Sequence, residues 1–176
     1  YERITKLLSY GINDSKKLKS RKRKMLSQII QKESLAYYIS SIEVSQINRV
    51  GIGKATFIAM RNVVKRLREN LPDQKNLPAG RQVFVLVDGF YIKYLKGIGF
   101  KNQKGIIHGD EVSLTIAAAS IIAKVARDNH MRRLSAKFPA YGWGRNKGYG
   151  TNFHRIQISK FGPTPLHRKD FIANFV

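Results

Sequence analysis

The sequence predicts an α/β fold, with a central mixed sheet flanked by helices and a small helical portion at the C-terminal end. Residues 83–87 (VFVLV) are continuously apolar, which is typical of a strand buried on both faces of a parallel sheet. Segments with apolar residues at helical spacing precede and follow this strand, as in layered α/β proteins. A chain of 176 residues, 43% of them hydrophobic, is sufficient for one core. We therefore expect a single domain over residues 1–176.

The first half of the chain is expected to alternate helices and strands. Apolar residues at helical spacing predict a helix from about Arg21 to Glu33, with Ser20 as its N-cap. The Tyr, Ile and Val residues of 35–44 predict a strand. A second helix is predicted around 55–67, ending before Pro72.

The middle of the chain is expected to carry the sheet and the longest helix. The polar stretch 71–82, with two prolines, predicts a surface loop before the strand at 83–87. A second short strand is predicted at 105–108. The longest helix then spans 112–137, and Pro139 prevents its continuation.

Small residues and loops dominate the remaining predictions. The segment 117–120 (AAAS) is small enough for the long helix to lie close against a sheet. Residues 141–150, rich in glycine and aromatic residues, predict a loop. Two short helices are expected to follow, near 152–161 and around 167–175.

The charge of the chain is its clearest functional signal. Its 33 Lys and Arg residues against 11 Asp and Glu residues give a net charge of +22. Seven of the nine residues from Lys16 to Lys24 are basic. Such clustering favours a nucleic-acid partner over evenly solvated surface charge or an anionic membrane.

Other classes of protein are disfavoured by composition. The chain has no cysteine, so it has no disulfide or thiolate metal site. Its longest apolar stretch, 114–123, is about half the length of a membrane span. The chain begins at Tyr1 without a charged and apolar leader, so we expect a fragment without a signal peptide. The expected protein is a cytoplasmic monomer that does not contact membranes.

Two aspartates are candidates for chemistry in this cationic chain. Asp88 follows the predicted buried strand, where α/β sheets bind ligands, although it could simply begin an Asp-Gly turn. Asp110 precedes the long helix, so it could simply cap that helix or be a first-turn carboxylate that interacts with the helix dipole. Together, two carboxylates at adjoining edges of a sheet suggest a divalent metal site for phosphate chemistry.

Other polar residues have more ordinary explanations. Asp128 is expected to form an i,i+4 surface pair with Lys124. The four histidines lack metal-ligand spacing, and we expect each to lie at the surface or to be hydrogen-bonded within the core. Tyr149 lies between Gly148 and Gly150, so its ring could stack on a sugar or base, or simply pack the loop.

Six strings along the chain resemble the type 2 ribonucleases H, specifically bacterial ribonuclease HII. They are NDSKKL (13–18), LVDG (86–89), HGD (108–110), IAAASIIAKVARD (116–128), KGYGT (147–151) and HRKDF (167–171). Their order and their coverage of nearly the whole chain make the resemblance specific.

The resemblance implies an RNase H-like fold and metal-dependent hydrolysis of RNA. Members cleave the RNA strand of RNA/DNA hybrids, and duplex DNA at single embedded ribonucleotides, with Mg²⁺ or Mn²⁺ held by four carboxylates. The third and fourth carboxylates match Asp88 and Asp110, and the tyrosine that stacks beside the ribonucleotide matches Tyr149. The resemblance also implies contacts with the nucleic-acid backbone by a further set: Asn13, Ser15, Lys16, Lys17, Lys124 and Arg127.

The sequence departs from the family pattern in one important respect. The family's first strand carries a DEAGRG-like motif that supplies two metal ligands and reads the 2′-hydroxyl, and no such string is present here. We expect that the first strands are missing and that the chain as given is nearly inactive. Asn146, where a histidine is common, and the long 71–82 loop are smaller departures. The alternative function is a non-catalytic, basic nucleic-acid-binding fragment.

Overall fold

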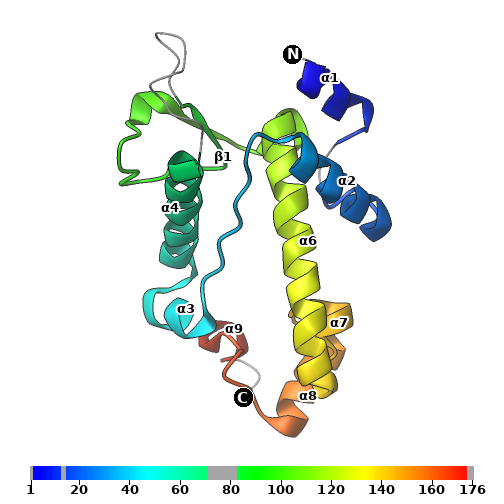
Figure 1. The fold of residues 1–176 in the computed structure, drawn as a ribbon. Helices are drawn as coiled ribbons and strands as arrows, with labels where there is room; N and C mark the ends of the chain where they lie inside the picture. The colour runs from blue at the N-terminus through cyan, green and yellow to red at the C-terminus, as the bar shows by residue number, and fades with distance from the viewer. Residues whose placement is uncertain (1, 13–14, 71–82, 174–176) are drawn as a thin grey trace. The chain divides into compact units, whose positions relative to one another are not determined.

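The computed structural model describes residues 2–12, 15–70 and 83–173, without the side chains of Glu2 and Arg3 (Figure 1). Contacts divide the chain into two compact units. Unit 1 comprises residues 1–40 and 60–125, and unit 2 comprises residues 41–59 and 126–176. The single domain expected from the sequence stays a prediction. The surface loop expected at 71–82 lies outside the described residues.

Helices make up most of the described structure. The elements in chain order are α1 (Glu2–Ser9), α2 (Ser20–Glu33), α3 (Val44–Val50), α4 (Ile52–Asn70), β1 (Val85–Asp88), η2 (Phe100–Asn102), β2 (Gln103–Ile106), α5 (Gly109–Val112), α6 (Leu114–Lys137), η3 (Pro139–Tyr141), α7 (Trp143–Asn146), α8 (Asn152–Phe161) and α9 (Lys169–Ile172). The boundary between the units falls within α4 and again within α6.

The sheet of unit 1 consists of two parallel strands in the described residues. Val85 of β1 is in register with Gln103 of β2, and Asp88 with Ile106. The ladder continues where Gly89 donates its N–H to the Ile106 carbonyl at 2.8 Å. The prediction that β1 is buried on both faces is wrong, because Val87 is buried but Leu86 is 39% exposed. Successive strand residues point to opposite faces, and the described residues cover only one of them.

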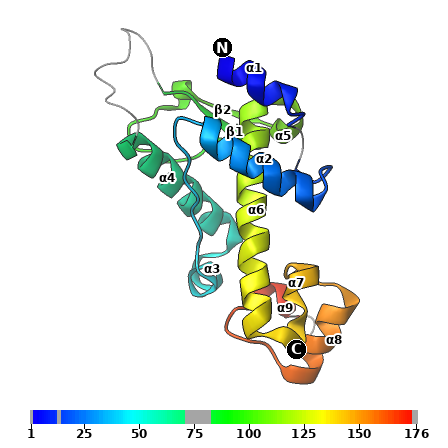
Figure 2. The same cartoon turned by 45° about the vertical axis from the view of Figure 1, so that its right-hand side comes forward.

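The core of unit 1 forms between two helices. Leu26 and Ile30 of α2 pack against Ala118, Ile121 and Ile122 of α6, and α2 crosses this part of α6 in Figures 1 and 2. Of the small residues of the 117–120 segment, Ala118 belongs to this cluster with α2. The expected close approach of the segment to a sheet stays a prediction.

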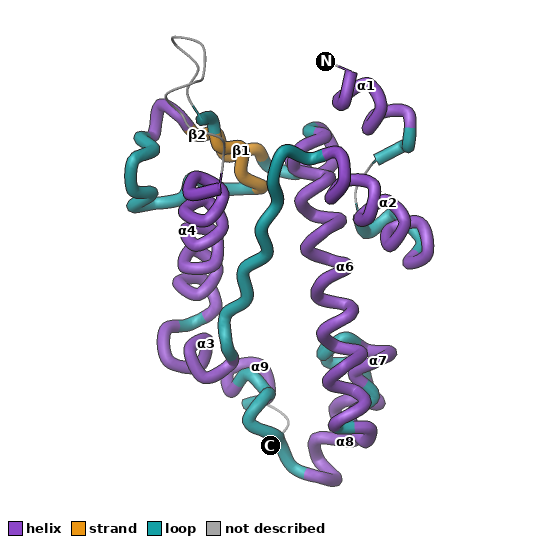
Figure 3. Tube along the Cα trace, in the orientation of Figure 1, coloured by secondary structure: helices purple, strands orange, loops and turns teal. Residues whose placement is uncertain are grey.

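Several predicted boundaries were wrong. Residues 35–43 form a loop instead of a strand (Figure 3), with Leu35 77% exposed. High β-propensity stabilises a strand only where a neighbouring strand pairs with it. The predicted strand at 105–108 lies two residues earlier, as β2. The N-cap of α2 is Lys19, not Ser20.

The long helix and the segment after it also differ in detail. The single helix predicted for 112–137 is divided into α5 and α6 at Ser113, whose φ of −125° and ψ of 117° are extended. The helix ends at Lys137, as predicted from Pro139. Residues 141–150 are not purely loop, because α7 lies within them.

Unit 2 has its own apolar cluster. Met131, Tyr141, Trp143 and Ile158 are buried together. Helix α8 has the predicted bounds. Within the helix predicted at 167–175, the described residues form the shorter α9, Lys169–Ile172. In the described part of the chain, no helix is both long and apolar enough to cross a membrane.

Candidate functional site

Asp88 ends β1 in unit 1, and its side chain reaches the start of α5. Its carboxylate Oδ1 accepts a hydrogen bond from the backbone N–H of Gly109 at 2.9 Å. His108 has a left-handed φ of 53°, which turns the chain immediately before Gly109. Gly109 is also closely surrounded, since an added Cβ would lie 2.6 Å from Cδ1 of Ile116. The turn thus places the residue before Asp110 directly against the Asp88 carboxylate.

Asp110 lies in the first turn of α5 and is only 6% exposed. Its Oδ2 lies 3.8 Å from Nζ of Lys16, whose side chain is 81% exposed. The adjoining Glu111 pairs with Lys17 at 3.2 Å. The structure therefore brings two of the predicted nucleic-acid-binding lysines to the acidic start of α5.

The segment that carries these lysines is held from two sides. Ser15 is buried, and its hydroxyl lies 2.9 Å from that of Ser120 on α6. Arg23 of α2 donates Nη1 to the carbonyl of Ser15 at 2.8 Å and to the carbonyl of Leu18. A nucleic-acid contact by Ser15 stays a prediction, with its hydroxyl directed at Ser120. Asn13 lies outside the described residues.

The donor set of Asp88 and Asp110 fits a hard divalent cation. Both residues offer carboxylate oxygens, which Mg²⁺ and Mn²⁺ prefer. One oxygen of Asp88 is bonded to Gly109, which leaves its second oxygen for a cation. Within the described residues, no three or more His, Cys, Asp or Glu side chains gather in a group that could hold a metal. Two carboxylates would supply only part of the coordination shell of such a cation.

Tyr149 lies in unit 2, in a turn whose backbone is extensively bonded. Its N–H donates to the carbonyl of Asn146 at 2.9 Å, and the Asn146 side chain accepts the N–H of Gly148 at 2.8 Å. Gly148 has a φ of 80°, which favours glycine. Arg127 donates Nη2 to the carbonyl of Lys147 at 3.3 Å. The Tyr149 side chain nevertheless remains exposed, at 69%.

Asp128 differs from its prediction as a surface residue, because it is only 5% exposed. It lies three positions before Met131 on α6, and residues at that spacing share a helix face. Since Met131 packs in the core of unit 2, Asp128 is turned inward as well. Lys124, which was predicted to contact nucleic acid, is half-buried in α6 of unit 1.

The histidines follow the ordinary explanation that the sequence favoured. His108 and His130 are exposed, whereas His154 and His167 are buried and hydrogen-bonded. Neither Glu111 nor the pair of His154 and His167 was predicted from the sequence. Glu111 could have been found from its position beside Asp110. The position of His154 could have been found from Thr151, a good N-cap residue three positions earlier, because the hydroxyl Oγ1 of Thr151 accepts the backbone N–H of His154 at 3.3 Å.

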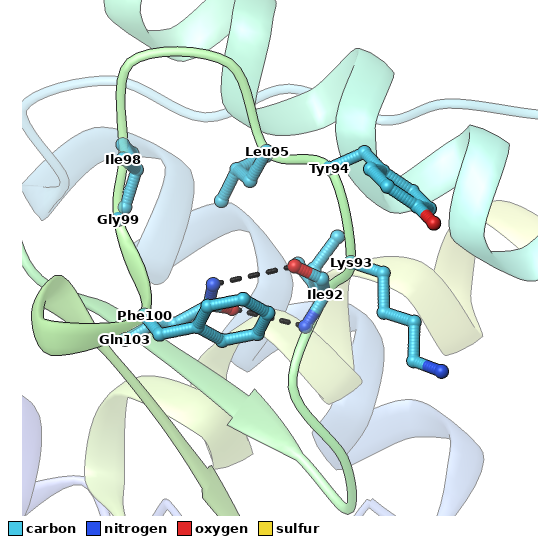
Figure 4. A pocket seen from close by; sticks show the side chains of 8 residues that line it. All are labelled: Ile92, Lys93, Tyr94, Leu95, Ile98, Gly99, Phe100 and Gln103. Atoms are coloured by element: carbon cyan, nitrogen blue, oxygen red, sulfur yellow. Dashed lines mark hydrogen bonds between the residues drawn. The ribbon is translucent and has the colours of Figure 1, made fainter.

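A separate hollow of about 450 Å³ lies in the loop between β1 and β2 (Figure 4). Gln103 fixes this loop, because its side chain accepts the N–H of Ile92 at 2.9 Å and donates to the Ile92 carbonyl at 3.2 Å. The lining residues are Ile92, Lys93, Tyr94, Leu95, Ile98, Gly99, Phe100 and Gln103. No carboxylate is among them, so this hollow lacks the donors of the candidate metal site.

Comparison with known proteins gives consistent results. The family model for Ribonuclease HII matches residues 1–174. The Ribonuclease HII of Caldicellulosiruptor bescii is 42% identical over 166 residues, which cover 94% of this chain and 73% of that protein. The Ribonuclease HII of Clostridium acetobutylicum is 40% identical over 169 residues, which cover 96% of this chain and 61% of that protein.

A solved structure supports the predicted fold. The crystal structure of Bst-RNase HIII in complex with Mn²⁺ matches with a TM-score of 0.64 at 19% sequence identity. The match covers 94% of this chain and 56% of that chain. The RNase H-like α/β fold expected from the sequence is thereby confirmed. The sequence motifs and these comparisons agree on one family.

Proposed function

The chain belongs to the ribonuclease HII family, a family of nucleases, and from this premise we propose that it acts on ribonucleotides paired with DNA. The proposed reaction is endonucleolytic hydrolysis of the RNA strand of RNA/DNA hybrids, and of duplex DNA at single embedded ribonucleotides. The chain spans about three quarters of the Caldicellulosiruptor bescii relative and less than two thirds of the Clostridium acetobutylicum relative. Its activity, substrates, monomeric state and cytoplasmic location are accordingly proposals.

One observation carries this proposal. The carboxylate of Asp88 bonds the backbone of Gly109, the residue immediately before the buried Asp110. The two acidic residues are thus held by one short turn, in a chain with a net charge of +22. This arrangement supports their assignment as the ligands of a divalent cation, Mg²⁺ or Mn²⁺.

The chemistry assigned to these residues is binding rather than proton transfer. Asp88 and Asp110 would hold such ions, which would supply activation of a water and stabilisation of the leaving 3′-oxygen, so that hydrolysis would leave a 5′-phosphate and a 3′-hydroxyl. Asp88 supplies the carboxylate oxygen that Gly109 does not use, and Gly109 restricts the rotation of the Asp88 side chain. Asp110 supplies its Oδ2, which at present faces the ammonium group of Lys16.

The cationic residues account for affinity without sequence preference. Lys16 and Lys17 are exposed at the acidic start of α5, where they would bind the phosphates of a duplex and release counterions. Lys124 and Arg127 are proposed to act in the same way. In unit 2, the exposed ring of Tyr149 is proposed to stack on the sugar beside the ribonucleotide.

Paired measurements of metal binding and cleavage test this function. Calorimetric titration of the 176-residue chain with Mn²⁺ should give a binding signal, and Asp88→Asn should abolish it. The control is Asp170→Asn, because Asp170 is an exposed carboxylate in unit 2. A fluorescent RNA/DNA hybrid should still bind Asp88→Asn, and any cleavage of the hybrid should be sensitive to EDTA and lost in this variant.

The competing function gives a different result. A non-catalytic, basic nucleic-acid-binding fragment would bind hybrid equally well with Mn²⁺ or EDTA, and Asp88→Asn would change neither binding nor calorimetric heat. That outcome would overturn the assignment of Asp88 and leave only the cationic surface as the functional feature.

A further inference from the structure

Two buried histidines of unit 2 lie beneath the turn that carries Tyr149. His154 is 4% exposed and His167 is 6% exposed. Their Nε2 atoms are 3.3 Å apart. The rings of Tyr141 and Trp143 pack around His167 at centroid distances of 5.0 and 5.2 Å. No step of the proposed hydrolysis uses this pair of histidines.

The hydrogen bonds determine where the proton lies on His154. The indole N–H of Trp143 can only donate, and it lies 3.0 Å from Nε2 of His154. This Nε2 is therefore an acceptor, so a neutral His154 carries its proton on Nδ1. Nδ1 lies 3.0 Å from the carbonyl oxygen of Tyr149 and donates to it.

The same reasoning fixes the proton of His167. The backbone N–H of Thr164 can only donate, and it lies 2.9 Å from Nδ1 of His167. The Thr164 hydroxyl lies 3.0 Å from the same nitrogen and can also donate to it, whereas the Thr164 carbonyl is farther away, at 3.3 Å. We therefore assign this nitrogen as an acceptor. The proton of His167 therefore lies on Nε2 and points at Nε2 of His154. Burial lowers the pKa of His167, the Thr164 carbonyl 3.3 Å from Nδ1 opposes this effect, and the neighbouring His154 lowers the pKa further. Because each ring has one nitrogen that accepts a hydrogen bond, the two rings are assigned opposite tautomers, with Nδ1–H on His154 and Nε2–H on His167.

This chain of hydrogen bonds ends on the backbone of Tyr149. The carbonyl of Tyr149 accepts from His154 and also from the N–H of Thr151 at 2.8 Å. Its N–H donates to Asn146. The backbone of Tyr149 is therefore held on both sides, whereas its side chain is mostly exposed.

We propose that His154 is a positioning residue for Tyr149, and that His167 keeps it in the tautomer whose Nδ1–H holds the Tyr149 carbonyl. The fixed backbone directs the exposed ring toward the sugar of a ribonucleotide in a DNA duplex. This inference rests on the proposed function of Tyr149 in substrate binding. The orientation of the Tyr149 ring then depends on the Nδ1 proton of the buried His154 and not on the loop sequence alone.

Two substitutions of His154 separate positioning from core packing. In His154→Gln, the terminal amide lies near the former Nε2, so the acceptor for Trp143 is kept and the donor to Tyr149 is lost. In His154→Asn, the amide lies near the former Nδ1, so the donor to Tyr149 is kept and the acceptor for Trp143 is lost. The exposed His130, changed to Gln, serves as a control for histidine substitution.

Binding is measured by fluorescence anisotropy with a labelled DNA duplex that contains one ribonucleotide, and with the matching all-DNA duplex. His154→Gln should bind the ribonucleotide duplex about fivefold more weakly, as expected for the loss of one hydrogen bond. Its affinity for the all-DNA duplex should be unchanged. His154→Asn should lose more thermal stability than His154→Gln but keep the ribonucleotide preference below its melting temperature.

Histidine ¹⁵N spectra of the unmodified protein provide a test that needs neither variant nor substrate. At pH 7.5 they should show His154 protonated on Nδ1 and His167 protonated on Nε2.

The indole N–H of Trp143 provides a second spectroscopic test, which compares variants. Trp143 is the sole tryptophan, so its indole N–H gives one resonance. This resonance should move in His154→Asn and much less in His154→Gln.

The outcomes distinguish this inference from the function on which it rests. If Tyr149→Ala leaves the ribonucleotide preference intact, Tyr149 does not contact the substrate, and both the function of this ring and its positioning are wrong. If Tyr149→Ala removes the preference but His154→Gln does not, only the positioning inference is overturned. The opposite tautomers, or a doubly protonated His154 at pH 7.5, would also overturn it.

Discussion

The close packing around Gly109 predicts a cost for the smallest possible substitution, Gly109→Ala. An added Cβ would lie 2.6 Å from Cδ1 and 3.3 Å from Cγ2 of Ile116, and 3.4 Å from Oδ1 of Asp88. The first distance is far below van der Waals contact, so the buried Ile116 must move. Gly109 donates its backbone N–H to Asp88, so a rearrangement at Gly109 also disturbs the proposed metal ligand.

Two opposing effects set the magnitude. Overpacking a buried site costs about 1 to 3 kcal/mol, whereas alanine is favoured over glycine in a helix by up to about 1 kcal/mol. Gly109→Ala should therefore lower the free energy of unfolding by about 0 to 3 kcal/mol, the difference between these terms. Gly53 on α4 is a matched control, because an added Cβ there meets nothing within 4 Å.

Urea unfolding and a double-mutant cycle with Ile116→Val measure this effect. Ile116→Val removes Cδ1 and alone should cost about 0.5 to 1.5 kcal/mol. In that background, Gly109→Ala should cost less than in the unmodified chain, because the closest contact is gone. Gly53→Ala should be neutral or stabilising. If Gly109→Ala stabilises the protein as much as Gly53→Ala does, the packing argument is wrong.

Three further predictions concern pH, salt and turnover. The pKa of His167 is lowered by burial in the folded protein. As the pH falls, this histidine is therefore protonated in the unfolded chain before it is protonated in the folded one. The free energy of unfolding should decrease below about pH 6.5, by at most about 1.4 kcal/mol per pH unit. Urea unfolding at pH 7.5 and 5.5 should show a smaller decrease for His167→Gln, and an equal decrease would contradict the assignment. Lys16→Gln should change the free energy of unfolding by less than about 1 kcal/mol, because the Lys16 side chain is 81% exposed and its Nζ lies 3.8 Å from Asp110. The salt dependence of hybrid binding should decrease by about one unit of slope. With Mn²⁺, the 176-residue chain should hydrolyse hybrid very slowly, since it has no DEAGRG-like string; brisk, EDTA-sensitive hydrolysis would show that this motif is dispensable.

The sequence predicted long helices better than strands. Helix α8 has the predicted bounds, and α6 ends where Pro139 requires. Periodic apolar residues specify a helix because its hydrogen bonds are local. Residues 35–43 have the composition of a strand but form a loop, because a strand also needs a partner that composition does not specify.

The candidate site could be predicted in its residue types but not in its contacts. The sequence drew attention to Asp88 and Asp110 because acidic residues are scarce in this chain. The bond from Gly109 to Asp88 depends on the left-handed turn at His108, which no local pattern of residues indicates. The burial of Asp128 likewise depends on which face of α6 packs in unit 2, which its spacing from Lys124 alone did not determine.

The central claim is that Asp88 and Asp110 hold the same divalent cation. Anomalous diffraction from crystals of this chain soaked in Mn²⁺ locates the ion directly. We expect a peak within about 2.0 to 2.6 Å of a carboxylate oxygen from each aspartate. A peak bound by only one of them, or Mn²⁺ found only elsewhere on the chain, would contradict it.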